Sequence, residues 1–305
     1  MSDLLAMGEA LIELNQPRAG APFVQGFGGD TSNAMIAAAR LGADAAYFTA
    51  VGADAFGQAL AELWRREGVD ASRIAINGGA HTGLYFVTHG PEGHSFSYMR
   101  AGSAASRIGE SDLPVDRLRD TKILHVSGIS QAISSSAADA VFAAIDIARG
   151  ASRLVSYDPN LRLKLWPLRR ARAIIHEAMR SCDIALPGLD DALELTGLSD
   201  SDAIVDFYLK LGARIVVLKL GKAGALAATA KGRERIPARP VAAIDATGAG
   251  DCFDGAFLAE FVRATDPFVA ARFANTAASL STLGYGAVAP LPRRADVEAA
   301  LVGAA

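Results

Sequence analysis

The stretch Val241–Glu260, V-A-A-I-D-A-T-G-A-G-D-C-F-D-G-A-F-L-A-E, most constrains what this chain can fold into. A short apolar run is followed by a loop of small residues. The remainder is helical in pattern, since Phe253, Phe257 and Phe261 recur every four residues. A Gly-rich loop that enters a helix turns several unpaired backbone N–H groups toward one point, where the helix dipole adds positive charge. The stretch therefore predicts an anion site, and phosphate is the anion that such sites most often bind.

Asp251 stands at the mouth of this anion site. It could be no more than the capping residue of a helix, and a lone G-x-G-D would favour that interpretation. Here Asp245, Thr247 and the run Gly248–Gly250 precede it, so the catalytic interpretation is favoured. A carboxylate beside a phosphate-binding loop is suited to taking the proton of a hydroxyl that attacks phosphorus.

Strand-like and helical runs alternate over most of the 305 residues, of which 51% are hydrophobic. This order predicts an α/β fold with a mostly parallel sheet. We expect no regular element after the G-Y-G-A-V-A-P stretch that ends at Pro290. The expected strands are Leu4–Met7, Ala10–Leu14, Ala45–Val51, Ile123–Ser127, Arg153–Tyr157, Ile184–Leu186, Ile215–Lys219 and Ala225–Thr229. The expected helices are a segment ending at Leu41, Gly57–Glu67, Ser134–Arg149, Leu168–Arg180, Ala203–Leu211, one starting at Asp251, and one around Phe268–Leu283.

A β-hairpin interrupts this order, with strands Gly83–His89 and His94–Arg100 joined by a turn at Gly90–Gly93. A hairpin inserted into an α/β chain is the expected anatomy of a lid. Its free edge also predicts pairing with a second subunit, and hence a homo-oligomer such as a dimer through the lid.

The period of two places Phe96, Tyr98 and Arg100 on one face of the second hairpin strand. These side chains could simply face solvent. If the face covers a cleft, they offer a ring that stacks on a sugar and a clamp for a carboxylate.

Three other Gly- or Asn-containing turns are candidate ligand contacts. The first, Gly26–Asn33, fails the dinucleotide pattern G-x-G-x-x-G because Thr31 replaces the third glycine, yet it still admits a ligand close to the backbone. The second, Asp158–Arg162, follows a strand at the sheet edge where open parallel sheets bind ligands. The third, Gly221–Gly224, serves a tight turn or a nucleotide; it is not a Walker motif, since alanine follows its lysine.

Composition excludes several classes of protein. The net charge is −3 with 30 basic and 33 acidic residues and no basic run, so nucleic acid is not an expected partner. The cysteines Cys182 and Cys252 and the five histidines show no zinc spacing. We read no signal peptide and no membrane span, and therefore expect a cytoplasmic enzyme.

The motifs G-G-D-T-S-N, V-L-K-L-G-K-A-G and D-A-T-G-A-G-D, with a βαβ body and an inserted hairpin, span nearly the whole chain. Together they resemble the ribokinase-like (phosphofructokinase-B) carbohydrate kinases. The resemblance implies one kinase domain over 1–305: a three-layer α/β/α sandwich with a mostly parallel central sheet and a small β-sheet lid formed by about 9–27 and 82–102. It implies ATP and Mg²⁺ as cofactors, with K⁺ as a candidate monovalent cation.

Within that family the chain is most similar to 2-keto-3-deoxygluconate kinases, through M-G-E-A-L-I-E, T-G-L-Y, S-Y-M-R-A-G-S-A-A-S and D-P-N-L-R. This similarity implies ATP-dependent phosphorylation of the terminal hydroxyl of a sugar acid. Arg100 and Arg162 are placed to bind its carboxylate in two-pronged fashion. Glu9 stands where ribokinases carry an aspartate for sugar hydroxyls, a departure that fits keto-deoxy acids better than neutral sugars.

The family resemblance also implies the residues of the site. Asp251 is the proton acceptor, and the backbone of Gly248, Ala249 and Gly250 is the anion hole. Substrate contacts are implied for Gly29, Asn33, Tyr85, Tyr98, Arg100 and Arg162. Nucleotide contacts are implied for Asn160, Arg162, Leu220, Gly221, Lys222, Ala223, Gly224 and Asn275, together with the anion hole.

Two acidic residues are implied metal contacts. The family usually shows N-x-x-E after the strand at Ile184–Leu186, but Gly188 and Asp191 stand at those positions here. Asp191 keeps the charge on a shorter arm and is an indirect Mg²⁺ contact. Asp245 resembles part of a monovalent-cation site.

Two alternatives remain open. A fructokinase, or another sugar or nucleoside kinase of the family, would have no need of a buried lid arginine. A sugar- or nucleotide-binding regulator that has lost catalysis is favoured slightly by the altered N-x-x-E and disfavoured by the intact Asp251.

Overall fold

A central sheet of eight strands organises the computed structural model, which describes residues 2–90 and 93–302. Six strands run parallel, and the last two in sequence are antiparallel, as expected for the Gly-bounded turn after β12. In spatial order the strands are β14 (Gly232–Ile236), β13 (Ala225–Thr229), β12 (Ile215–Lys219), β11 (Ile184–Ala185), β10 (Leu154–Asp158), β9 (Thr121–Ser127), β1 (Ser2–Met7) and β4 (Ala45–Phe48).

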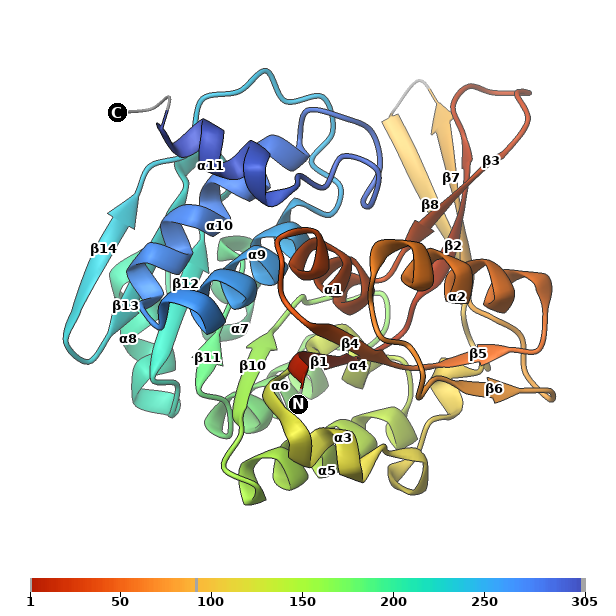
Figure 1. Ribbon diagram of the computed structural model, residues 1–305, viewed down its shortest axis with the longest axis horizontal. Helices are drawn as coiled ribbons and strands as arrows, with labels where there is room; N and C mark the ends of the chain where they lie inside the picture. Colours follow the sequence, from red (N-terminus) through yellow and green to blue (C-terminus); the bar gives the residue numbers. More distant parts are fainter. Residues whose placement is uncertain (1, 91–92, 303–305) are drawn as a thin grey trace.

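Helices cover both faces of this sheet (Figure 1). Alternate side chains of β1 show why: Leu4 and Ala6 enter one hydrophobic core, whereas Leu5 and Met7 enter the other. The first core is closed by α1 (Asp30–Arg40), α2 (Ala55–Glu67), α9 (Ala249–Ala264), α10 (Pro267–Ser281) and α11 (Arg294–Val302). The second is closed by α3 (Val115–Asp120), α5 (Ser135–Gly150), α6 (Leu168–Arg180), α7 (Leu189–Thr196) and α8 (Ser201–Leu211), with the short α4 (Gly128–Ala132) before α5. The predicted α/β/α sandwich is confirmed.

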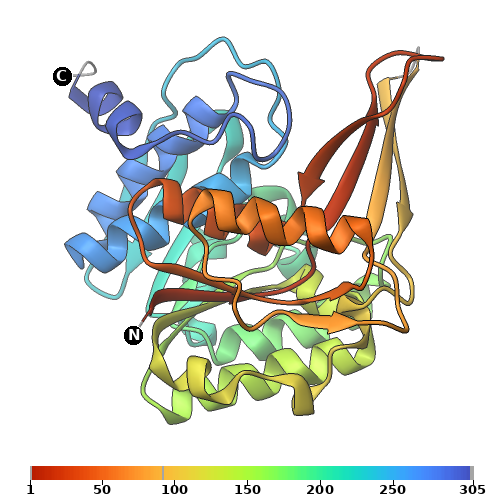
Figure 2. The same ribbon diagram turned by 45° about the vertical axis from the view of Figure 1, so that its right-hand side comes forward.

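A second, four-stranded sheet projects from one end of this body (Figures 1 and 2). Its order is β3 (Val24–Gly28), β2 (Leu11–Gln16), β7 (Leu84–Gly90) and β8 (Gly93–Met99). The strands come from the two segments expected to form the lid, and β7 and β8 form the expected hairpin. Its turn at Pro91 and Glu92 lies outside the described residues. A two-stranded sheet, β5 (Ala50–Gly52) and β6 (Ala75–Asn77), lies beside α2.

The structure differs from the sequence-based expectations in how short strands are partnered. The two expected N-terminal strands, which a turn at Gly8-Glu9 separates, lie in different sheets: β1 joins the main sheet and β2 the small one. The expected strand Ala45–Val51 divides at the buried Thr49, so that β4 and β5 lie in different sheets. Alternating hydrophobicity shows that a segment is extended, but it does not identify the neighbouring strand.

Seven helices and strands in the part of the chain described were not expected: β3, β6, β14, α3, α4, α7 and α11. β3 lies in a segment interpreted as irregular, and it is ordered by pairing with β2 along Leu11↔Gly28 to Asn15↔Val24. β14 pairs with β13 in the same way. The expectation of no element beyond Pro290 is wrong, because α11 buries Val297 and its Arg294 forms a 2.9 Å ion pair with the buried Glu260 of α9. In the part of the chain described, no helix has the length and hydropathy to cross a membrane.

Candidate active site

The loop that precedes α9 forms the predicted anion site together with the first turn of that helix. Gly248 is the N-cap residue with φ 74°, and a Cβ built on it would lie only 2.9 Å from the Cα of Ala287. Both its conformation and the lack of space therefore require glycine. The helix begins at Ala249, whose N–H donates to Ala246 in the turn at 3.1 Å. Gly250 and Asp251 follow in this turn and line the cleft, and N–H groups of a first helical turn have no intrahelical acceptors.

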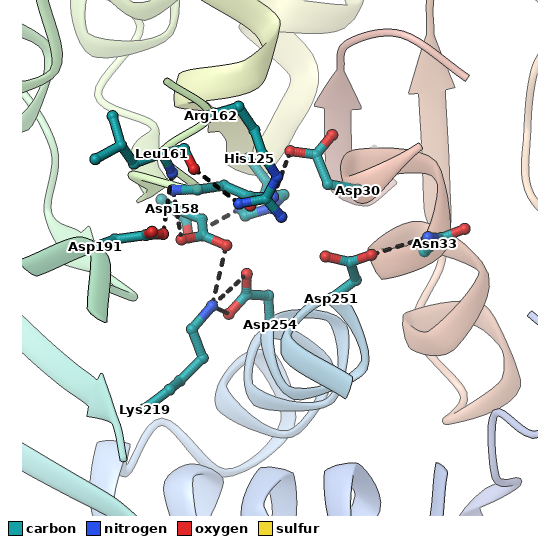
Figure 3. A network of polar contacts seen from close by, with 12 residues as sticks. Asp30, Asn33, His125, Asp158, Leu161, Arg162, Asp191, Lys219, Asp251 and Asp254 are labelled. Carbon is teal, nitrogen blue, oxygen red and sulfur yellow. Dashed lines mark hydrogen bonds and ion pairs between the residues drawn. The ribbon is translucent and has the colours of Figure 1, made fainter. Parts of the chain in front are cut away.

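Asp251 lies in that first turn and is hydrogen-bonded to a residue of another helix (Figure 3). The Nδ2 of Asn33, on α1, donates to its Oδ2 at 2.8 Å. The helices can approach so closely because Gly255, one turn further along α9, has no side chain: a Cβ there would lie 2.1 Å from the carbonyl oxygen of Ala34. Two residues far apart in sequence thus become one unit of the site.

The environment of Asp251 suits a general base. Burial, followed by the negative charge of Asp30, raises the pKa of its carboxyl to about 7, while the hydrogen bond from Asn33 opposes the shift. A base with a pKa near neutrality combines a substantial ionised fraction with enough basicity to accept a proton.

A largely buried ammonium lies near the same turn of α9, and the sequence analysis had not assigned it a role. Lys219, at the end of β12, donates to Asp158 Oδ2 at 3.0 Å and to the two oxygens of Asp254 at 2.9 and 3.1 Å (Figure 3). Burial favours the neutral acid at both aspartates, but Lys219 lowers the pKa of Asp158, whereas the pKa of Asp254 is raised. The only sequence signals were the placement of Asp158 and Lys219 at strand ends and of Asp254 one turn after Asp251.

The loop after β10 connects the two halves of the site. Asn160, with φ 32°, donates through Nδ2 to Asp30 Oδ2 at 2.9 Å, which ties this loop to α1. Asp191, at the start of α7, accepts the backbone N–H of Leu161 at 3.0 Å. Burial and the charge of Asp158 raise the pKa of Asp191 to about 6. Asp191 therefore holds the loop that carries Arg162, whose Nη1 donates to the Leu161 carbonyl at 2.9 Å.

Arg100 approaches the cleft from the end of β8, but it has a partner that the sequence did not reveal. Its Nε donates to Oε2 of the fully buried Glu9 at 2.7 Å, and Nη2 lies 2.5 Å from the same oxygen. Ser103 Oγ donates to the other oxygen of Glu9 at 2.5 Å. The guanidinium lies 5.8 Å from the ring centroid of Tyr98, which is 45% exposed.

Tyr85, on the adjacent β7, is held in a comparable way. Its hydroxyl donates to Glu13 Oε2 at 2.5 Å, and its ring lies against Gly28, where a Cβ would be 2.7 Å from the hydroxyl oxygen. Gly29 follows with φ 114°, and a Cβ there would be 2.5 Å from the Glu9 carbonyl oxygen. Gly28 lets β3 accommodate the Tyr85 ring within the small sheet, and Gly29 lets the start of α1 approach the backbone of Glu9 and Ala10.

A continuous cleft of about 1600 Å³ joins these groups. Among the described residues it is lined by nearly all the candidates, from Glu9 and Tyr85 on the small sheet to Asn275 on α10. Ala223 and Asp245 are not among its lining residues. Asp245 instead accepts hydrogen bonds from the backbone N–H groups of Thr247 and Gly286, both at 2.9 Å, behind the anion loop.

Comparison with known proteins gives a consistent result. The model of the pfkB family carbohydrate kinases matches residues 1–294. The 2-dehydro-3-deoxygluconokinase of Thermoproteus tenax is 36% identical over 97% of this chain and 94% of its own length. Fructokinase-1 of Oryza sativa subsp. japonica is 34% identical over 96% of each chain. The crystal structure of a putative ribokinase II from E. coli in complex with ATP and Mg²⁺ covers 99% of this chain and 100% of its own, with a TM-score of 0.92 and 26% identity.

The match of the family model and of relatives along nearly the full length agrees with the geometry of the cleft. A carboxylate with a raised pKa lies at a helix N-terminus, between a sheet that carries polar and aromatic side chains and a Gly-bounded turn. This chain is a sugar kinase and belongs to the pfkB family of carbohydrate kinases.

Proposed function

We propose that this kinase transfers the γ-phosphoryl group of ATP to the terminal hydroxyl of 2-keto-3-deoxygluconate. The observation that carries the proposal of phosphoryl transfer is the half-buried Asp251 in the first turn of α9, with its pKa raised to about 7. Its carboxylate takes the proton of the sugar hydroxyl as the oxygen attacks phosphorus. The backbone N–H groups of Gly248–Gly250 receive the charge that develops on the phosphoryl oxygens.

Arg100 supports a sugar acid as the acceptor. Its side chain is only 11% exposed, is held by Glu9 and lines the cleft. A ligand carboxylate there would meet this cation, and Arg162 lines the same cleft as a second cation. The name of the Thermoproteus tenax relative agrees with this substrate.

A fructokinase is the second candidate, and one observation favours it. Glu9 already compensates the charge of Arg100, so the pair as a whole presents no net positive charge to the ligand. The rice fructokinase is nearly as similar as the archaeal relative. In this alternative, Arg100 would organise the small sheet, and the sugar would be bound through hydroxyl groups.

ATP and Mg²⁺, named for the E. coli structure, are part of the proposal, as is a cytoplasmic location where ATP is available. No cluster of three or more His, Cys, Asp or Glu side chains suited to a metal occurs among the described residues. Mg²⁺ would therefore be held mainly by ATP phosphates and water, with Asp191 acting indirectly. Asp245 would support a K⁺ site through its loop; equal activity with and without potassium would remove that part of the proposal.

A panel assay tests the substrate. Purified protein with Mg²⁺ and ATP should release ADP rapidly with 2-keto-3-deoxygluconate, and at least about tenfold more slowly, as kcat/KM, with fructose, ribose or nucleosides. A difference of that size corresponds to about 1.4 kcal/mol, the scale of one good contact. Preference for fructose would establish the second candidate instead, and binding without turnover of any member would support the regulator.

The small sheet also supports a dimer. Its edge strands β3 and β8 expose Val24 (59%) and Met99 (57%), and open edges are usually covered by another chain. Light scattering should show a dimer that Met99→Lys or Val24→Lys converts to a monomer. The control is Ile76→Lys, at an even more exposed apolar residue (70%) outside this sheet. A monomeric wild-type protein at micromolar concentration would contradict the proposal.

A further inference from the structure

Lys219 is a buried cation at the floor of the cleft. Its side chain is only 13% exposed, yet it is one of the lining residues. It comes from the end of β12, while its partners come from β10 and α9. Three elements that carry the site therefore meet at one ammonium group.

The ammonium also lies beside the anion loop. A Cβ built on Gly250 would be 3.8 Å from Lys219 Nζ, so the ammonium is close to the first-turn backbone at which a phosphate is expected. Figure 3 shows Lys219 reaching Asp254 on one side of α9, while Asp251 points from the same helix toward Asn33. An anion seated on the N–H groups of this turn would have the ammonium as a neighbour.

The acidic residues around Lys219 leave this part of the cleft rich in negative charge, which a cation offsets. Asp30, Asp158 and Asp251 line the cleft, Asp254 contacts Lys219, and the phosphates of a nucleotide add further negative charge. Burial raises the pKa of Asp254, whereas Lys219 lowers the pKa of Asp158. Hydrogen bonds to both aspartates, of 2.9 to 3.1 Å, fix the ammonium beside the anion loop.

We propose that Lys219 is a catalytic residue whose ammonium contacts an oxygen of the phosphoryl group during its transfer, with Asp158 and Asp254 holding it in place. In that step the bond from phosphorus to the ADP oxygen breaks, and a bond to the sugar oxygen forms. The hydroxyl proton passes to Asp251, and Lys219 keeps its protons throughout. The inference rests on phosphoryl transfer in this cleft, but not on which sugar is the acceptor.

Kinetics of three variants test the contact. Lys219→Met should lower kcat by about 10²–10³-fold, the cost of removing one preorganised charge stabiliser. Lys219→Arg should restore part of the activity, because the positive charge is kept with altered geometry. The matched control is Lys231→Met at the exposed turn between β13 and β14, which should behave as wild type.

A second comparison separates phosphate contact from a role in holding the helix. Asp254→Asn removes one partner but leaves the ammonium, so its loss of kcat should be at least tenfold smaller than that of Lys219→Met. In calorimetry, Lys219→Met should weaken the binding of ATP about tenfold and leave that of adenosine unchanged. If Lys219→Met fails to fold, the double variant Lys219→Met/Asp254→Asn replaces it. In the double variant only Asp158, and not Asp254 as well, is a carboxyl that has lost the ammonium as its partner.

Failure of the Lys219 proposal can be distinguished from failure of the proposed function. If the wild-type protein phosphorylates none of the sugars, the proposed function fails, and the binding of ATP relative to adenosine still tests Lys219. If folded Lys219→Met keeps kcat within threefold of wild type, the inference is overturned. It is also overturned if Asp254→Asn is as damaging as Lys219→Met, or if ATP and adenosine weaken equally.

Discussion

Asp251→Asn should lower kcat by about 10²–10⁴-fold, the usual cost of losing a general base, and leave the affinity for ATP nearly unchanged. The amide has the shape of the carboxylate, and Asn33 can still donate to its oxygen, so the fold is retained. Steady-state kinetics and ATP calorimetry on the purified variant measure the two effects. The control is Asp139→Asn on the exposed face of α5, which removes the same charge far from the cleft.

Near-wild-type kcat in the Asp251 variant would show that another group accepts the proton. Equal loss of turnover and of ATP affinity would instead show that Asp251 serves nucleotide binding.

The pH dependence of the same carboxyl has a defined sign. Since burial and Asp30 raise its pKa to about 7, kcat/KM should fall as pH decreases below that value and the base becomes protonated. The folded protein retains this proton to a higher pH than the unfolded chain, whose carboxyl ionises near 3.8. The stability that the group contributes is therefore present below that pH and is lost as pH rises to about 7.

Asp251→Asn removes this pH-dependent loss, so the variant should be more stable than wild type at pH 8, by about 1 kcal/mol or more. The difference should shrink toward pH 4, and unfolding in urea at both pH values measures it. A variant less stable than wild type at pH 8 would show that the carboxylate is well compensated in the folded state.

Arg100→Ala should raise KM for a keto-deoxy acid by about ten- to a hundredfold. A charge-assisted contact in a closed cleft is worth about 1.5–3 kcal/mol, and about 1.4 kcal/mol is tenfold. A neutral hexose should be affected much less. Lysine should restore only part of the affinity, because it cannot make a two-pronged contact.

The ion pair with Glu9 calls for a second variant. Truncating Arg100 leaves the buried Glu9 carboxylate with Ser103 as its remaining partner, and an unpaired buried charge destabilises the fold. The double variant Glu9→Gln/Arg100→Ala removes both charges, and Glu9→Gln alone is its control. Small and equal changes in KM for an acid and a neutral sugar would reject the sugar-acid assignment and favour fructokinase.

The sequence by itself determined the elements whose signals are local. The α6 boundaries Leu168–Arg180 and the antiparallel strands β12 and β13 agree with the expected ranges residue for residue. The Gly-rich loop before α9 was recognisable because glycine at Gly248 and the helical period after Asp251 are properties of neighbouring residues. These signals sufficed for the fold class and for the proton-acceptor hypothesis.

Only the tertiary structure decided which side chains of the site contact one another. Asn33 and Asp251 are 218 residues apart, Glu9 and Arg100 are 91 apart, and Asp158 and Lys219 are 61 apart. Such contacts depend on helix packing, strand order and the space left by residues such as Gly255, none of which is encoded in a local period. The same reason explains why β1 and β2 entered different sheets, and why Lys219 passed unnoticed until three elements brought its partners together.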